Sequence, residues 1–297
     1  MSLLAMSNMT QAAYEYNLPE QVTEIGREIT ALHNLIFVIC LVILILVSGA
    51  MFYSIYAHRK SRGVEAATFS HSTKLEVIWT VIPVIILIVM AVPATQVLIK
   101  QEDTTKSDLT LKVTGYQWKW QYEYLDNGID FYSTLTTPRE QIDQFSGKVE
   151  QGVNYLQEVD NHVVIPSGKK VRLLLTANDV IHAWWVPKLG GKKDAIPGYI
   201  TEMWIRADVG AEGTYRGRCA ELCGKDHAYM PIVVDVVTQE EYEQWVAVNA
   251  EAASHEIKNV ADIQLDEMKQ PQSERFVSQK VKPIESVDDA QQRVMAN

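Results

Sequence analysis

Two long apolar segments near the N-terminus constrain this 297-residue chain more than any other feature. The first covers residues 35–57 and, as a helix rising 1.5 Å per residue, would be about 34 Å long. The second covers residues 75–98 and carries a single charged side chain, Glu76, near its start. Each is long enough to cross a bilayer, so we predict two transmembrane helices. A signal peptide is a poor alternative for the first segment, because its apolar run is too long and acidic residues precede it.

The connecting loop, residues 58–74, predicts the orientation of this hairpin. It carries four basic side chains against one acidic side chain, Glu65; the basic ones are Arg59, Lys60, Arg62 and Lys74. Short loops rich in lysine and arginine stay in the cytoplasm. We therefore expect a protein of the bacterial inner (plasma) membrane. Its N-terminal segment, residues 1–34, and everything after residue 100 would lie on the outer, periplasmic side.

Residues 101–253 have the pattern of an all-β domain. Residues 109–113 and 119–124 alternate between apolar and polar side chains, and short apolar runs follow at 163–165, 171–175, 202–205 and 232–237. Turn residues separate these runs without intervening helical patterns, which favours a Greek-key sandwich or barrel. Residues 239–253 resemble a short amphipathic helix after an N-cap at Thr238. The polar remainder, residues 254–297, is predicted to be a flexible or partner-ordered tail.

The charge balance limits the partners of this domain. The whole chain has a formal net charge of −10, and residues 101–253 contain 23 acidic and 15 basic residues. Nucleic-acid binding depends on lysine and arginine neutralising phosphates, so we expect no nucleic-acid partner. An acidic surface suits a basic protein partner instead.

Sulfur and imidazole donors are concentrated in one loop of the exported domain. Residues 219–230 contain Cys219, Cys223, His227 and Met230, and a further imidazole, His182, lies at the end of another strand signal. Thiolate, imidazole and thioether together favour copper. Zinc accepts two cysteines and two histidines but gains little from a nearby methionine. Blue-copper sites use a single cysteine, whereas two thiolates can bridge two copper ions.

The same two cysteines have another interpretation. Cys219 and Cys223 are separated by three residues in an oxidising compartment, where they could form a disulfide, as in a copper chaperone or a thiol–disulfide protein. The nearby histidine and methionine argue against that interpretation. The β-only pattern argues against it as well, because a thioredoxin-like fold needs interleaved helices. Cys40 lies in the first apolar segment, where a small hydrophobic side chain is the simplest explanation.

These motifs resemble subunit II of the haem–copper cytochrome c oxidases. The resemblance covers about residues 20–250 and rests on Cys219-x-Glu-x-Cys223-x₃-His227-x₂-Met230, His182-Ala-Trp-Trp-Val-Pro, Asp194-Ala-Ile-Pro-Gly198, Gln117-Trp-Lys-Trp-Gln-Tyr-Glu-Tyr124 and Glu76-Val-Ile-Trp-Thr-Val-Ile-Pro83. It implies a two-span transmembrane α-helical hairpin followed by an all-β, cupredoxin-like extramembrane domain.

The resemblance also implies the metal sites. A binuclear copper centre, CuA, would be held by the backbone carbonyl of Glu221 and the side chains of His182, Cys219, Cys223, His227 and Met230. The carboxylate of Glu221 would bind a magnesium ion at the interface with subunit I, which alone carries the haems. The indoles of Trp184 and Trp185 would exclude water from the copper centre.

The function implied is electron transfer in respiration. Subunit II accepts single electrons from cytochrome c at CuA and passes them to the haems of subunit I, where oxygen is reduced to water with proton pumping. The implied partners are subunits I and III, cytochrome c and membrane lipid.

Individual roles follow from the same resemblance. Electrons would enter through Trp118, whereas Trp120 fits a packed strand aromatic. Glu76 would lie at the mouth of a proton-uptake pathway, although from its position alone a solvated helix end is the simpler explanation. The acids that match cytochrome c docking positions are Glu123, Asp160 and Asp179. A CuA domain that serves a nitrogen-oxide reductase is an alternative, but Glu76 and the two-span hairpin favour the oxidase.

Overall fold

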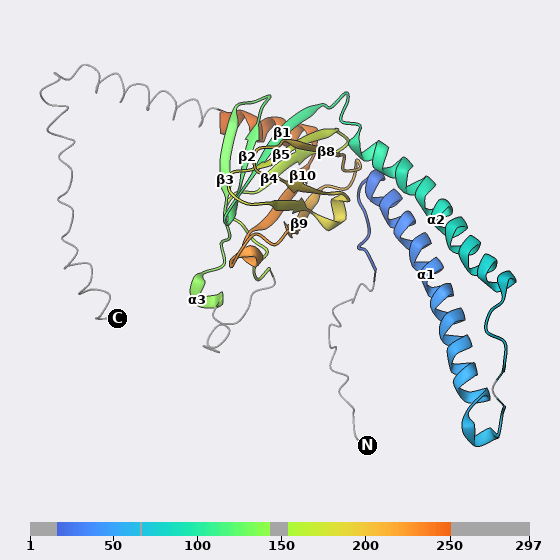
Figure 1. The fold of residues 1–297 in the computed structure, drawn as a ribbon. Helices are drawn as coiled ribbons and strands as arrows, with labels where there is room; N and C mark the ends of the chain where they lie inside the picture. The colour runs from blue at the N-terminus through green and yellow to red at the C-terminus, as the bar shows by residue number, and fades with distance from the viewer. Residues whose placement is uncertain (1–16, 66, 143–153, 251–297) are drawn as a thin grey trace, which may run out of the picture. The chain divides into compact units, whose positions relative to one another are not determined.

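The computed structural model describes residues 17–65, 67–142 and 154–250. Two long helices, α1 (Glu24–Ala57) and α2 (Thr73–Glu102), form the N-terminal hairpin, joined through a short 3₁₀ turn, η1 (Lys60–Arg62) (Figure 1). Both helices are long and apolar enough to cross a membrane, and their most apolar stretches are not buried inside the protein. The predicted spans 35–57 and 75–98 lie within these helices.

Helix α1 begins before its apolar segment because its first turns contact the β domain. Thr23 caps the helix by accepting a hydrogen bond from the Gly26 amide, and its hydroxyl donates to the Leu189 carbonyl at 3.0 Å. A Cβ atom on Gly190 would lie 2.9 Å from the Gly26 Cα. Glycine is therefore needed where the helix start crosses the domain.

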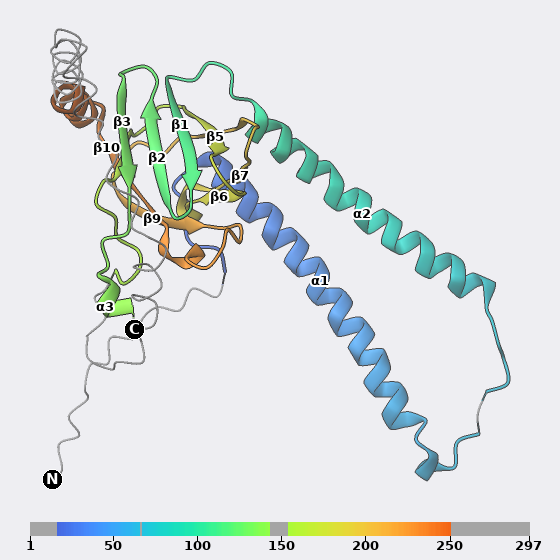
Figure 2. The same ribbon diagram turned by 60° about the vertical axis from the view of Figure 1, so that its left-hand side comes forward.

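The remaining elements form a sandwich of two five-stranded sheets. One sheet has the order β3-β2-β1-β5-β8 and the other β4-β10-β9-β6-β7. The strands are β1 (Leu109–Tyr116), β2 (Lys119–Tyr124), β3 (Ile129–Ser133), β4 (Val163–Pro166), β5 (Val171–Ala177), β6 (His182–Trp185), β7 (Lys192–Ala195), β8 (Thr201–Ile205), β9 (Gly213–Cys219) and β10 (Pro231–Val237). Figure 2 shows β1, β2 and β3 as neighbouring strands of the first sheet.

This arrangement confirms the predicted fold class, a two-helix hairpin followed by an all-β sandwich. Most strand pairs are antiparallel, but β1 pairs with β5 and β4 pairs with β10 in parallel. Strands that pair in parallel cannot be joined by a tight hairpin, so the chain crosses between sheets before returning. Four strands, β3, β6, β7 and β9, lie where the sequence pattern indicated none; His182, expected at the end of a strand, instead begins β6.

The core lies between the sheets and is rich in aromatic side chains. Trp120, Tyr122 and Tyr124 alternate along β2 and are fully buried, as the period-two pattern predicts. Leu111 on β1 and Leu173 on β5 face the same core. Trp120 is therefore a packed strand aromatic, as expected.

Short helical elements complete the domain. They are α3 (Arg139–Ile142), η2 (Pro187–Leu189) and η3 (His227–Tyr229). A further helix begins at residue 239, where Thr238 Oγ1 accepts a hydrogen bond from the Glu241 amide, which agrees with the predicted N-cap. The predicted tail, residues 254–297, and the first 16 residues lie outside the described chain.

Candidate metal centre

The candidate centre lies where β6 and β9 run side by side in the second sheet. His182 begins β6, Cys219 ends β9, and Trp184 pairs with Cys219 in the register. His182 is fully buried because Gly115 on β1 leaves room for its ring: a Cβ atom there would lie 2.8 Å from His182 Cδ2. The sheet register therefore brings residue 182 to the start of the 219–230 loop.

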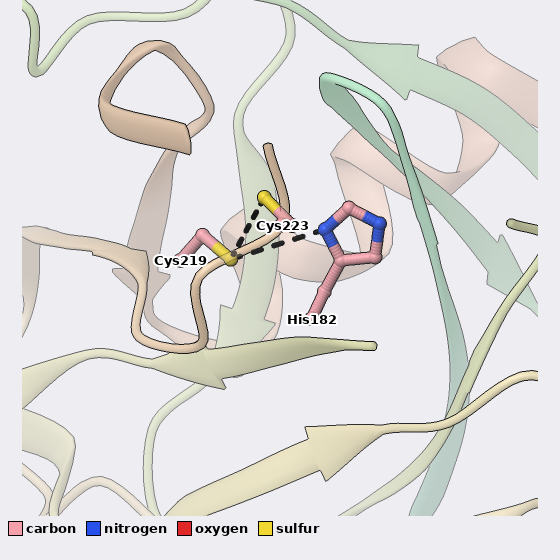
Figure 3. Close-up of side chains that lie close together, drawn as sticks. All are labelled: His182, Cys219 and Cys223. Atoms are coloured by element: carbon pink, nitrogen blue, oxygen red, sulfur yellow. Dashed lines mark hydrogen bonds between the residues drawn. The ribbon is translucent and has the colours of Figure 1, made fainter. Parts of the chain in front are cut away.

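The predicted side-chain donors converge at this point. Cys219 Sγ lies 3.8 Å from Cys223 Sγ and 3.9 Å from His182 Nδ1 (Figure 3). On the other side, Cys223 Sγ lies 3.4 Å from His227 Nδ1 and 3.5 Å from Met230 Sδ. The carbonyl oxygen of Glu221 lies 3.3 Å from Cys219 Sγ. The other four groups predicted to hold copper therefore surround the two cysteine sulfur atoms, which completes the predicted set of six.

The two cysteines are free thiols. A disulfide bond needs sulfur atoms about 2.05 Å apart, and these are 3.8 Å apart. The structure therefore has two free thiols at the position where the alternative interpretation of the sequence predicts a disulfide.

The electrostatics of the cluster favour a bound cation. Burial opposes ionisation of Cys219, but hydrogen bonds with His182 and the Ala183 and Glu221 backbone outweigh it and lower the pKa of its thiol. Burial and the neighbouring Cys219 raise the pKa of Cys223 to about 12. Two adjacent thiolates are therefore unfavourable here unless a metal ion compensates their charge. Sulfur and imidazole donors fit a soft metal such as copper.

Asp179 orients the buried histidine. Its carboxylate lies 2.9 Å from His182 Nε2 and also accepts hydrogen bonds from the Gln117 and Val180 amides. Burial opposes ionisation of Asp179, but these hydrogen bonds outweigh it and lower its pKa. Burial also disfavours the charged form of His182, which by itself would lower its pKa. Hydrogen bonds with Cys219 and Asp179 outweigh burial, and the pKa of His182 is raised overall. With Nε2 held by Asp179, Nδ1 faces the sulfur atoms.

Sequence reasoning placed Asp179 at a docking surface and missed this contact. The available signal was the spacing of an aspartate three residues before a candidate metal-binding histidine. Carboxylates commonly hold the outer nitrogen of metal-binding histidines.

Trp118 is attached to the cluster through the backbone of Cys223. Its indole Nε1 donates to the Cys223 carbonyl at 3.2 Å, and the Gln117 side-chain amide donates to the same oxygen at 2.8 Å. The ring is half-buried and borders a surface pocket of about 300 Å³. Trp118 thus lies between the solvent and the sulfur atoms.

The two tryptophans of β6 have different surroundings. Trp184 is buried, and its Nε1 donates to the Tyr122 hydroxyl at 3.3 Å. Trp185 instead lines a cavity beside α1 and α2, so the expectation that it shields the donors is wrong. The reason is the alternation of a strand, which directs neighbouring side chains to opposite faces.

The remaining predicted residues lie apart from the sulfur atoms. The side chain of Glu221 is exposed, although its carbonyl belongs to the cluster. Glu76 is exposed in the first turn of α2. Glu123 forms an ion pair with Lys112, and Asp160 accepts a hydrogen bond from the Thr134 amide at 2.7 Å.

Comparisons with known proteins agree with this architecture. Residues 109–237 match the family model "Cytochrome C oxidase subunit II, periplasmic domain", and residues 11–97 match "Cytochrome C oxidase subunit II, transmembrane domain". A probable cytochrome c oxidase subunit 2 of Rickettsia bellii is 40% identical over 232 residues, covering 78% of this chain and 82% of the relative. Cytochrome c oxidase subunit 2 of Cereibacter sphaeroides is 37% identical, covering 80% of each chain.

Among solved structures, the periplasmic domain of subunit II of cytochrome oxidase from Bradyrhizobium japonicum is 40% identical. The match covers 50% of this chain and 98% of that domain, with a TM-score of 0.43. The family models fall on the helical hairpin and on the β domain that carries the sulfur cluster. The chain therefore belongs to the cytochrome c oxidase subunit II family and is a membrane protein with an extramembrane domain.

Proposed function

We propose that this chain accepts single electrons from cytochrome c at a binuclear CuA centre and passes them to the haems of subunit I. One observation carries the proposal: three side-chain donors and one carbonyl surround a pair of buried thiols 3.8 Å apart. The two thiols would hold the copper centre, which would supply the one-electron redox chemistry at this point.

The ligands divide between the two sulfur atoms. His182 and the Glu221 carbonyl lie beside Cys219, and His227 and Met230 lie beside Cys223. We infer that these four groups, together with the two cysteine sulfurs, would hold the copper of the centre. Asp179 keeps His182 in the tautomer whose Nδ1 is free to bind metal.

Trp118 is proposed as the residue through which electrons enter. Its ring is half-buried, and its hydrogen bond to the Cys223 carbonyl links it directly to the residue that holds a bridging sulfur. The excess of acidic over basic residues in 101–253 suits a basic cytochrome c. Glu123 and Asp160 stay proposed docking acids. The carboxylate of Asp179 contacts His182 Nε2, and its side chain is only 27% exposed, so it is a weaker docking candidate.

The rest of the assembly is also proposed. Subunits I and III would surround the hairpin, with Glu76 at the mouth of a proton-uptake pathway that supports proton pumping. The exposed Glu221 carboxylate would bind magnesium against subunit I. The basic η1 loop would face the cytoplasm of a bacterium, and the β domain the periplasm.

A copper chaperone or thiol–disulfide protein is the second candidate, because its cysteines would also be free thiols when reduced. It is less favourable because Met230 and His227 both contact Cys223, and a redox cysteine pair has no need of them. The two candidates differ in metal content and in electronic structure.

The test is copper reconstitution of the full chain in detergent under reducing conditions, followed by electron paramagnetic resonance. We expect about two copper ions per chain and a hyperfine pattern from one electron shared by two nuclei. A single copper ion with a mononuclear spectrum, or a stable Cys219–Cys223 disulfide that binds none, would contradict the proposal.

A further inference from the structure

Trp120, a fully buried tryptophan of β2, contacts two members of the predicted donor set. Its ring lies edge-on to the imidazole of His182, with the ring centroids 5.8 Å apart. Its indole Nε1 donates a hydrogen bond to the Met230 carbonyl oxygen at 3.3 Å. His182 lies beside Cys219, and Met230 lies beside Cys223. One indole therefore touches both halves of the sulfur cluster.

This indole comes from the sheet to which none of the six predicted donors belongs. Trp120 lies in the sheet β3-β2-β1-β5-β8, whereas His182 begins β6 and Met230 directly precedes β10, both strands of the other sheet. The remaining predicted donors lie at the end of β9 or in the loop that follows it. Side chains from the two inner faces of a sandwich interdigitate to form its core. Trp120 therefore holds the donors against a part of the fold that they do not themselves form.

The register of β1 and β2 explains how the indole reaches His182. Trp120 pairs with Gly115 across these strands, and a Cβ atom on Gly115 would lie 2.8 Å from His182 Cδ2. The glycine leaves space for the imidazole, and the tryptophan opposite it packs against the ring. Edge-to-face contact is favoured because the positive edge of one ring meets the negative face of the other. With Asp179 at Nε2, this contact restrains the orientation of the imidazole.

The hydrogen bond to Met230 restrains the end of the 219–230 loop. Met230 is buried, and an unpaired carbonyl at such a position would cost free energy, which favours the bond to Trp120. The next residue, Pro231, has no backbone N–H, so the chain itself offers one donor fewer at this point. The sulfur of Met230 lies 3.5 Å from Cys223 Sγ. Movement of the Met230 backbone would therefore change this distance.

The neighbouring aromatic residues of β2 bond elsewhere. The hydroxyl of Tyr122 accepts a hydrogen bond from Trp184 Nε1, and the hydroxyl of Tyr124 donates to the Val164 carbonyl at 2.8 Å. Neither Trp184 nor Val164 is a predicted donor. All three aromatic side chains of β2 are buried on the same face. Burial alone therefore does not distinguish Trp120 from the rest of the core, but its hydrogen-bond partner does.

We propose that Trp120 is a positioning residue of the metal centre, which holds the Met230 sulfur near Cys223 through the Met230 carbonyl and restrains the ring of His182. This inference rests on the proposed function and deepens it. Thioether sulfur is a soft ligand that favours reduced copper, and a weak methionine ligand tunes the reduction potential of copper sites. A loosely held Met230 would therefore disfavour the reduced form of the centre.

The first test replaces the indole N–H and measures the reduction potential. Trp120→3-benzothienylalanine keeps the bicyclic ring and puts sulfur in place of the N–H group. In the copper-loaded full chain in detergent, we expect about two copper ions to stay bound while the equilibrium constant for reduction falls about threefold. One net hydrogen bond is worth about fivefold in an equilibrium constant, and only part of it differs between the two oxidation states. A threefold fall lowers the potential by about 28 mV.

The same replacement at Trp204 is the matched control. The Trp204 side chain is also buried, and its indole Nε1 donates to the Lys100 carbonyl at 2.8 Å, away from the sulfur cluster. It should leave the potential unchanged. A parental potential in the Trp120 variant, or an equal shift in both variants, overturns the proposal.

The second test needs no metal. Amide deuterium exchange of the reduced, metal-free full chain is followed by mass spectrometry. The amides of His227 and Tyr229 donate to carbonyls within the 219–230 loop, and we expect the Trp120 replacement to speed their exchange about fivefold. Peptides from β5 should keep their parental rates. Unchanged exchange of the loop, or an equal increase throughout the β domain, overturns the proposal.

Because the exchange measurement involves no copper, it decides the positioning role independently. A parent chain that forms no binuclear centre would contradict the proposed function instead.

The ring contact is tested by Trp120→Phe and Trp120→Leu. Phenylalanine keeps an aromatic ring beside His182, whereas leucine does not. Electron–nuclear double resonance of the copper-loaded chain measures the coupling to the histidine nitrogens. We expect this coupling to change in the leucine variant and to stay near the parental value in the phenylalanine variant. The same coupling in both variants contradicts the restraint on His182.

Discussion

The sulfur cluster and the junction between the hairpin and the β domain both join distant parts of the chain, but with opposite chemistry. At the junction, Arg27 pairs with Asp208 and Glu24 with Arg206, and the side chains of these pairs are 42–51% exposed. In the cluster, His182 and Cys219 are 0% and 2% exposed. The junction therefore satisfies its own charges, whereas the cluster gathers buried donors that a cation would complete.

The difference indicates where substitutions matter. Exposed ion pairs contribute little individually, because water and salt screen them. Buried donors arranged around a metal act together, so the loss of one removes much of the binding. The predictions below test this contrast, in order of decreasing effect.

The largest effect is expected for Cys223→Ser. It removes the sulfur that contacts Cys219, His227 and Met230, so bound copper should fall from about two ions to less than one per chain. Metal analysis measures this. Cys40→Ser is the matched control, since Cys40 is an exposed thiol of α1. Retention of two copper ions by the Cys223 variant would contradict the ligand assignment.

Gly115→Ala should displace His182, although Gly115 is not itself one of the predicted donors. Its methyl group would lie 2.8 Å from His182 Cδ2, so the ring or β1 must shift. We expect a loss of about 1–3 kcal/mol in unfolding free energy, together with weaker copper binding. Gly49→Ala, whose methyl group meets nothing within 4 Å, is the control in a thermal unfolding series. Equal behaviour of the two variants would contradict the close packing.

Asp179→Asn should weaken copper binding without abolishing it. The neutral amide holds His182 Nε2 less firmly than the carboxylate does, and a loss of about 10–100-fold in affinity is typical of such contacts. Competition with a chelator measures this loss. Asp160→Asn, at another proposed docking acid, should leave copper affinity unchanged. If Asp179→Asn alters only cytochrome c association, the docking interpretation is the correct one.

At the junction, Glu202→Gln should have a smaller effect that depends on pH. The hydrogen bond with Arg172 and that with Thr104 lower the pKa of Glu202 below its ordinary value of 4.5. The ionised side chain therefore stabilises the fold above pH 4.5, and this contribution is lost as the pH falls through the lowered pKa. Because the pair is about a third exposed, we expect at most about 1 kcal/mol at pH 7.

Unfolding of the parent and the Glu202→Gln variant is compared at pH 7 and pH 3. Their difference should shrink at pH 3. A difference of the same size at both pH values would show that the contribution of Glu202 is not ionic.

The smallest effect is expected for Arg27→Ala. This guanidinium is 51% exposed and pairs with Asp208, so its removal should change the unfolding free energy by about 0–1 kcal/mol. A double-mutant cycle with Asp208→Ala isolates the pair. A coupling energy of several kcal/mol would place the junction in the same class as the cluster.

The sequence predicted the hairpin and the donor set because both depend on strong local patterns. Long apolar runs define the helices, and five of the six predicted donors share one loop, residues 219–230. The early start of α1 was missed, since the contacts of Thr23 and Gly26 with the domain come from residues far along the chain.

Strand β9 was missed for a similar reason. Its sequence, Gly213-Thr-Tyr-Arg-Gly-Arg-Cys219, has no apolar alternation, and its position is set by pairing with β10. The contact between Asp179 and His182 was missed because both residues were assigned separate roles from their family positions. In each case the deciding interaction is tertiary, which local patterns do not record.

The short seam between β6 and β9 has a consequence for exchange with solvent. β6 meets β9 only at Trp184 with Cys219 and Trp185 with Arg218, whereas β1 and β5 pair along residues 109–115. β6 stays paired with β7 along residues 182–185, but few hydrogen bonds join it to β9, so this seam opens at a lower free energy than the sandwich unfolds. Amide deuterium uptake should therefore begin in β6 before β5, and that opening frees His182 from the sulfur atoms while the rest of the core stays intact.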